Sequence, residues 1–92
     1  MRVRWTGPAA DDLQDIVRFI RNDNPTAARK MAALIVDAVM NLRKMPYRGR
    51  PGLVPGTREL VFAPYPYVAV YEVISDSVQV LRIRHAAQDW PA

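Results

Sequence analysis

The segment that decides the fold covers residues 6–42 and reads TGPAADDLQDIVRFIRNDNPTAARKMAALIVDAVMNL. Thr6 or Gly7, followed by Pro8, is typical of the first residues of a helix. The apolar side chains that follow recur at helical spacing: Leu13, Ile16, Val17 and Ile20. The Asn-Asp-Asn-Pro run at residues 22–25 then predicts the end of this helix, because proline cannot continue it.

A second helix is expected directly after this break, with Thr26 as its capping residue. Its apolar stripe again has a period of 3.6 residues and consists of Ala28, Met31, Ala32, Ile35, Ala38, Val39 and Leu42. The connection between the two stripes is short, which is typical of antiparallel neighbours. The segment therefore predicts a helical hairpin.

Strand-like runs flank this hairpin on both sides. Residues 2–5 alternate polar and apolar side chains before it, and residues 58–63, 67–74 and 78–84 form three such runs after it. Residues 45–56 hold three prolines and three of the four glycines and are expected to form a loop. The order β-α-α-β-β-β predicts an α+β fold over residues 1–92, a single domain with a mostly antiparallel sheet. The hairpin would cover one face, leaving the other open for a partner or substrate.

The composition excludes several classes of protein. The chain has no cysteine and one histidine, so it can form neither a disulfide scaffold nor a thiolate metal site, and we expect no metal or cofactor. The first residues lack the apolar region of a signal peptide, and no run of about 18 apolar residues is present to span a membrane. These features favour a cytoplasmic protein that does not enter membranes.

The positive charge is concentrated in one part of the chain. Residues 1–42 hold six basic and five acidic side chains, whereas residues 43–58 hold five basic side chains and no acidic one. Eleven of the thirteen cations are arginine, whose planar guanidinium suits phosphate and carboxylate groups. An anionic partner and an ordinary solvated surface both agree with this pattern.

Alternation along the strands assigns side chains to the two faces of the sheet. It places Leu81, Ile83 and His85 on one face and Val78, Val80 and the last two strand arginines on the other, and it separates Arg58 from Glu59. Because an unpaired charge is costly under packed helices, Arg82 and Arg84 are expected on the open face or its rim. We hypothesise that several arginines converge there on one basic concavity: Arg48, Arg50, Arg58, Arg82 and Arg84. Arg58 pairing with Glu72 or Asp76 is the competing expectation.

An ordered set of short motifs resembles the RelE/ParE superfamily of toxins across nearly the whole chain. These motifs are Pro-Ala-Ala-Asp-Asp-Leu at 8–13, Asn-Pro-Thr-Ala-Ala at 24–28, Pro-Tyr-Arg-Gly-Arg at 46–50, Gly-Thr-Arg-Glu-Leu at 56–60, Pro-Tyr-Val at 66–68 and Leu-Arg-Ile-Arg-His-Ala-Ala-Gln-Asp-Trp at 81–90. The resemblance implies a toxin of a type II toxin–antitoxin system. It also implies a cognate antitoxin whose C-terminal segment wraps the toxin, and for which an acidic or amphipathic segment would suit the basic surface.

The resemblance leaves two targets open. ParE-like members inhibit DNA gyrase, and RelE-like members cleave mRNA on the ribosome. RNA cleavage requires a base, an acid and cations, which Arg58, Arg82 and His85 would supply in part. RelE-like sites are typically richer in lysine and commonly have a tyrosine or histidine near the C-terminus as the acid. This chain has two lysines and no tyrosine after Tyr71, so His85 alone keeps the nuclease alternative open.

The ParE branch is therefore favoured. Its expected contacts with target or antitoxin are the five arginines of the proposed concavity together with Trp90. A further alternative is a weakly toxic member that acts mainly within a DNA-binding autoregulatory complex with its antitoxin.

Overall fold

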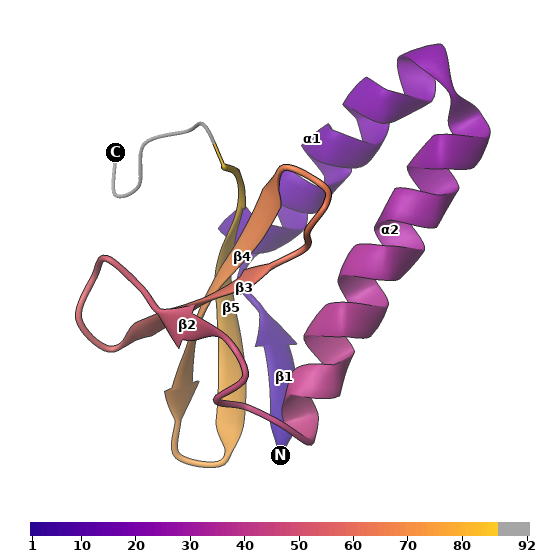
Figure 1. The fold of residues 1–92 in the computed structure, drawn as a ribbon. Helices are drawn as coiled ribbons and strands as arrows, with labels where there is room; N and C mark the ends of the chain where they lie inside the picture. Colours follow the sequence, from indigo (N-terminus) through magenta and orange to yellow (C-terminus); the bar gives the residue numbers. More distant parts are fainter. Residues whose placement is uncertain (87–92) are drawn as a thin grey trace.

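The computed structural model describes residues 1–86 and places two helices beside a five-stranded sheet (Figure 1). The elements in chain order are β1 (Arg2–Trp5), α1 (Gly7–Asp23), α2 (Pro25–Met40), a short 3-10 helix η1 (Asn41–Arg43), β2 (Arg50–Pro51), β3 (Thr57–Val61), β4 (Tyr67–Ile74) and β5 (Ser77–His85). The predicted α+β class and the order β-α-α-β-β-β are confirmed, with the two-residue strand β2 added inside the predicted loop.

The sheet has the strand order β1-β5-β4-β3-β2. Strands β2 to β5 pair antiparallel with their neighbours, whereas β1 runs parallel to β5. The parallel pair requires a crossover, and the helical hairpin between β1 and the remaining strands provides it. The hairpin lies against one face of the sheet (Figure 1), as the sequence predicted.

Capping side chains define the ends of the hairpin. The Thr6 hydroxyl accepts a hydrogen bond from the Ala9 amide, which makes Thr6 the N-cap of α1. The second cap was wrongly predicted. Asn24 rather than Thr26 caps α2, because the Asn24 side chain accepts from the Ala27 amide while Thr26 already lies inside the helix.

The hydrophobic core lies between the hairpin and the sheet. Its buried members are Ala9, Met31, Ile35, Val39, Leu42, Leu60, Phe62, Ala69, Tyr71, Val78, Val80 and Ile83. Most of the apolar stripe predicted for α2 is part of this core. Of the stripe predicted for α1, Leu13, Ile16 and Ile20 pack at the margin of the core. Among the described residues, no helix is long and apolar enough to cross a bilayer.

Candidate functional site

A β-bulge in β5 changes which of its side chains face the helices. Val70 of β4 pairs with Arg82, but the next residue, Tyr71, pairs with Val80, so Leu81 is the extra residue. As a result Ile83 joins Val78 and Val80 in the helix-facing core. The prediction that strict alternation places Ile83 opposite these valines was therefore wrong, because the extra residue shifts the alternation by one position.

Arg82 is held by an aspartate from the first helix. The Asp12 carboxylate accepts hydrogen bonds from Nε of Arg82 at 2.7 Å and from Nη2 at 2.9 Å. The same carboxylate accepts from the Ile83 amide at 3.0 Å. The hydrogen bonds and charge of Asp12 raise the pKa of Arg82 and outweigh the lowering by desolvation, so the guanidinium stays charged.

The position of this contact follows from the short length of β1. Strand β1 ends at Trp5, opposite Val80, so β5 extends beyond its parallel partner. Thr6 bonds the carbonyl oxygens of Val80 and Leu81 through its hydroxyl, and Asp12 bonds the amide of Ile83. The first turns of α1 therefore satisfy the backbone groups at this edge of β5.

Arg58 contacts the backbone of the loop before β3 rather than an acidic partner. Its Nε donates to the Gly49 carbonyl at 2.9 Å and its Nη2 donates to the Tyr47 carbonyl at 3.1 Å. The guanidinium carbon also lies 5.5 Å from the centre of the Tyr47 ring, within cation–π range. The expected pairing with Glu72 or Asp76 is therefore replaced by contacts with this loop.

Tyr71 holds the same loop in place through its hydroxyl group. Its ring is completely buried, and its hydroxyl accepts from the Gly49 amide and donates to the Pro46 carbonyl, both at 2.8 Å. A Cβ at residue 49 would lie 2.7 Å from this hydroxyl and 2.8 Å from the Glu59 carbonyl oxygen, so only glycine fits there. The strand pattern of residues 67–74 does not predict this role, because the loop that Tyr71 contacts lies more than twenty residues earlier in the chain.

Three of the predicted arginines line two neighbouring hollows at the β2–β3 side of the sheet. Arg50 forms an ion pair with Glu59 at 2.9 Å, and both residues line two hollows. One hollow has a volume of about 160 Å³, and Leu53 and Arg84 are also among its lining residues. The other has a volume of about 230 Å³ and is also lined by Arg48. The predicted basic concavity is therefore partly present.

The remaining two arginines of the hypothesis do not join these hollows. Arg58 pairs in register with Tyr71, and Arg82 pairs with Val70. Tyr71 and Val70 are successive residues of one strand, so the two arginines start from opposite faces of the sheet. The convergence of all five arginines on one concavity was therefore wrong.

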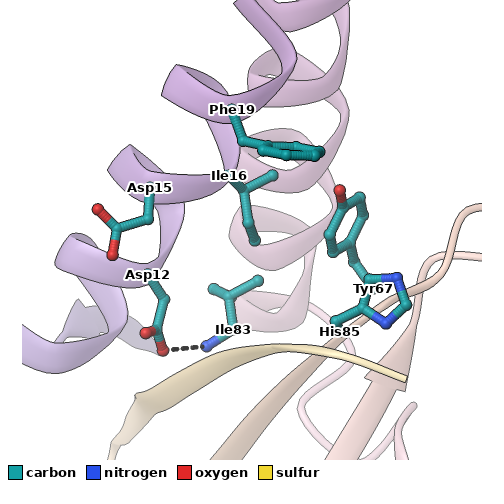
Figure 2. Close-up of a pocket in the computed structure, with 7 residues that line it drawn as sticks. All are labelled: Asp12, Asp15, Ile16, Phe19, Tyr67, Ile83 and His85. Carbon is teal, nitrogen blue, oxygen red and sulfur yellow. Dashed lines mark hydrogen bonds between the residues drawn. The ribbon is translucent and has the colours of Figure 1, made fainter. Parts of the chain in front are cut away.

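His85 lies at the end of a groove between α1 and the sheet. The groove has a volume of about 380 Å³ and is lined by Asp12, Asp15, Ile16, Phe19, Tyr67, Ile83 and His85. In Figure 2, Phe19 of α1 points toward Tyr67, and Ile16 points into the groove toward Ile83. The rings of Tyr67 and His85 pack edge to face, with their centres 5.7 Å apart. Phe19 is 72% exposed, which leaves a large apolar surface on the rim of the groove.

The candidate nuclease residues do not share one set of contacts, although Asp12, which binds Arg82, lines the same groove as His85. Arg58 contacts the loop carbonyls, Arg82 contacts Asp12, and His85 contacts Tyr67 in the groove. Glu59, the neighbour of Arg58 in the chain, pairs with Arg50 on the face opposite Arg58. Trp90 lies outside the described residues. Within residues 1–86, no group of histidines and carboxylates is arranged to hold a metal ion.

Comparison with known proteins identifies the family. The sequence model of the family described as "ParE toxin of type II toxin-antitoxin system, parDE" matches residues 3–90. The chain belongs to the ParE toxin family. A toxin of this family has a cognate antitoxin as its partner, which agrees with the resemblance seen in the sequence.

Individual relatives resemble this ParE-family chain over nearly its full length. Y4kP of Sinorhizobium fredii is 43% identical over 90 residues, which cover 98% of this chain and 93% of that protein. Toxin RelE2 of Caulobacter vibrioides is 43% identical over 88 residues, which cover 95% of this chain and 97% of that protein. The solved chromosomal ParDE system from P. aeruginosa gives a TM-score of 0.85 at 34% identity, covering 92% of this chain and 95% of that one.

Proposed function

We propose that this ParE-family toxin inhibits DNA gyrase, and thereby DNA replication, by binding rather than by catalysis. The observation that carries the proposal is the separation of Arg58 from Arg82. The two start from opposite faces of the sheet, and Arg82 forms a bidentate pair with Asp12. A phosphoryl-transfer site requires its cations and its acid around one phosphate, and this arrangement does not provide that.

A second candidate function is ribosome-dependent cleavage of mRNA. It is favoured by the 43% identity with a relative named toxin RelE2 and by the imidazole at the end of the groove. In that case His85 would act as the acid or base of the cleavage reaction. Loss of the imidazole would then abolish toxicity.

The cognate antitoxin is proposed to neutralise the toxin through its C-terminal segment. The groove beside α1 offers apolar surface for such a segment, since Ile16 and the exposed Phe19 form one wall and Tyr67 the other (Figure 2). An amphipathic segment would fold on this surface, burying its apolar side chains between helix and sheet.

The target is tested by inducing the toxin without antitoxin in cells and pulse-labelling DNA and protein synthesis in parallel. We expect DNA synthesis to fall first, in cells producing the wild type and equally in cells producing His85→Ala or His85→Gln. These single variants are preferable to the removal of Arg82, which would also break the contact with Asp12. A fall in translation first, abolished by both His85 variants, would establish the nuclease instead.

A further inference from the structure

Helix α1 has an apolar surface that the core does not use. Of its 17 residues, all of them described by the structure, Ala9 alone is buried, and Leu13, Ile16 and Ile20 pack at the margin of the core. Val17 is half-buried, but it is not among the described side chains that pack against the core. Val17 and Leu13 instead line a hollow of about 340 Å³, and every described residue that lines it belongs to α1.

A stripe of side chains runs through this hollow along the helix. Its members are Ala10, Gln14, Val17 and Arg21, which recur at intervals of four, three and four residues and therefore lie on one side of α1. Alternating steps of three and four residues are the spacing at which one helix packs along another. Three members are exposed and Val17 is half-buried, so the surface is accessible. These four residues are called the α1 stripe below.

The charges beside the α1 stripe are opposite at its two ends. Asp11 is exposed next to Ala10 at the N-terminal end, and Arg18 and Arg21 are exposed at the C-terminal end. A second α1 helix running antiparallel would place the N-terminal end of one stripe against the C-terminal end of the other. Arg21 of one copy would then cross the small side chain of Ala10 in the other copy and reach Asp11 there. Two-fold symmetry repeats this contact, so the surface is complementary to itself.

We propose that the α1 stripe is the contact between two copies of the toxin, which pair through antiparallel α1 helices. A second copy is favoured over a different partner because one stripe supplies both halves of each charge pair. A single pair of helices is a small interface, so the dimer is expected to be weak and to depend on the toxin concentration. The inference goes beyond the proposed function and holds for either target of the toxin.

Pairing through the α1 stripe leaves the antitoxin groove of each copy open. On the helix side that groove is bordered by Asp12, Asp15, Ile16 and Phe19, and none of these residues lines the hollow around Val17. Figure 2 shows Ile16 and Phe19 on the groove side of α1. A dimer would therefore keep two grooves available, one for each antitoxin segment, and the antitoxin is not expected to compete with pairing.

The test uses charge-reversing variants of α1 and matched variants of α2. Asp11→Arg and Arg21→Glu change the proposed contact, while Asp37→Arg and Arg29→Glu make the same replacements at exposed positions of α2. Sedimentation equilibrium of the antitoxin-free toxin measures the dissociation constant of the dimer, with circular dichroism to confirm folding. We expect each α1 variant to raise this constant about tenfold, because two symmetry-related contacts are lost together, and each α2 variant to stay within about twofold.

A mixture of the two α1 variants tests the antiparallel arrangement. In a dimer of Asp11→Arg with Arg21→Glu, both contacts again join opposite charges, so the mixture should pair as tightly as the wild type although neither variant does so alone. Wild-type toxin that stays monomeric at millimolar concentration would overturn the inference. A mixture that stays as weak as the single variants would refute the antiparallel contact. Loss of antitoxin affinity by the α1 variants of a monomeric toxin would assign the stripe to the antitoxin instead.

Discussion

The contact between Asp12 and Arg82 is expected to be the polar interaction on which the fold depends most. Asp12→Ala removes three hydrogen bonds that join α1 to β5 and leaves a guanidinium whose side chain is only 33% exposed. Breaking a fully buried ion pair costs about 3–5 kcal/mol, and partial exposure lowers this to about 2–3 kcal/mol here. Because 1 kcal/mol shifts the Tm of a domain of this size by about 4–8 °C, a decrease of about 10–20 °C is expected.

The assay is thermal unfolding of the antitoxin-free toxin by circular dichroism, and α1 provides the control. Oδ1 of Asp15 lies 3.9 Å from Nη1 of Arg18, and the side chains of Asp15 and Arg18 are 76% and 64% exposed. Asp15→Ala should therefore lower the free energy of unfolding by less than about 0.5 kcal/mol. Asp12→Asn keeps a hydrogen-bond acceptor but loses the negative charge, so its Tm should lie between those of Asp12→Ala and Asp15→Ala. If Asp12→Ala lowers the Tm no more than Asp15→Ala, the stabilising role assigned to the Asp12 carboxylate is wrong.

Three further predictions concern the loop and the groove. Tyr71→Phe leaves the buried Gly49 amide without its acceptor, so the free energy of unfolding should fall by about 1–3 kcal/mol. Hydrogen exchange at the Gly49 amide should also accelerate, and an unchanged exchange rate would contradict the role of Tyr71 in holding the loop. Gly49→Ala forces a Cβ against the Tyr71 hydroxyl and should cost at least about 1–3 kcal/mol in urea unfolding; wild-type stability would show that the space is available. Phe19→Asp should weaken antitoxin binding in a titration by about tenfold, and unchanged affinity would remove the groove as the antitoxin site.

The sequence predicted those features that depend on local periodicity. The two apolar stripes with a period of 3.6 gave the hairpin, and alternation gave β1 and the last three strands. Thr6 was one of the two caps predicted for α1, because capping depends on residues adjacent in the chain, and the structure selects Thr6 over Gly7. Asn24 was missed because an Asn-Pro pair indicates a break as well as a cap, and the break alone was considered.

The candidate site was predicted less well because its contacts depend on tertiary structure. Asp12 and Arg82 are 70 residues apart, and nothing in the local pattern of either indicates the pair. The bulge at Leu81 adds one residue to β5, and strict alternation cannot detect such an insertion. Arg58 and Arg82 start from opposite faces of the sheet because of the register in which β3 and β5 pair with β4. The sequence alone does not supply this register.

Gyrase inhibition is tested most directly with purified components. Wild-type toxin and His85→Ala are added to DNA gyrase with relaxed plasmid and ATP, and in parallel to a cell-free translation reaction. We predict that both proteins block supercoiling, that added cognate antitoxin relieves the block, and that neither protein cleaves mRNA. Full supercoiling activity in the presence of toxin, with mRNA cleaved by the wild type but not by His85→Ala, would contradict the proposed function.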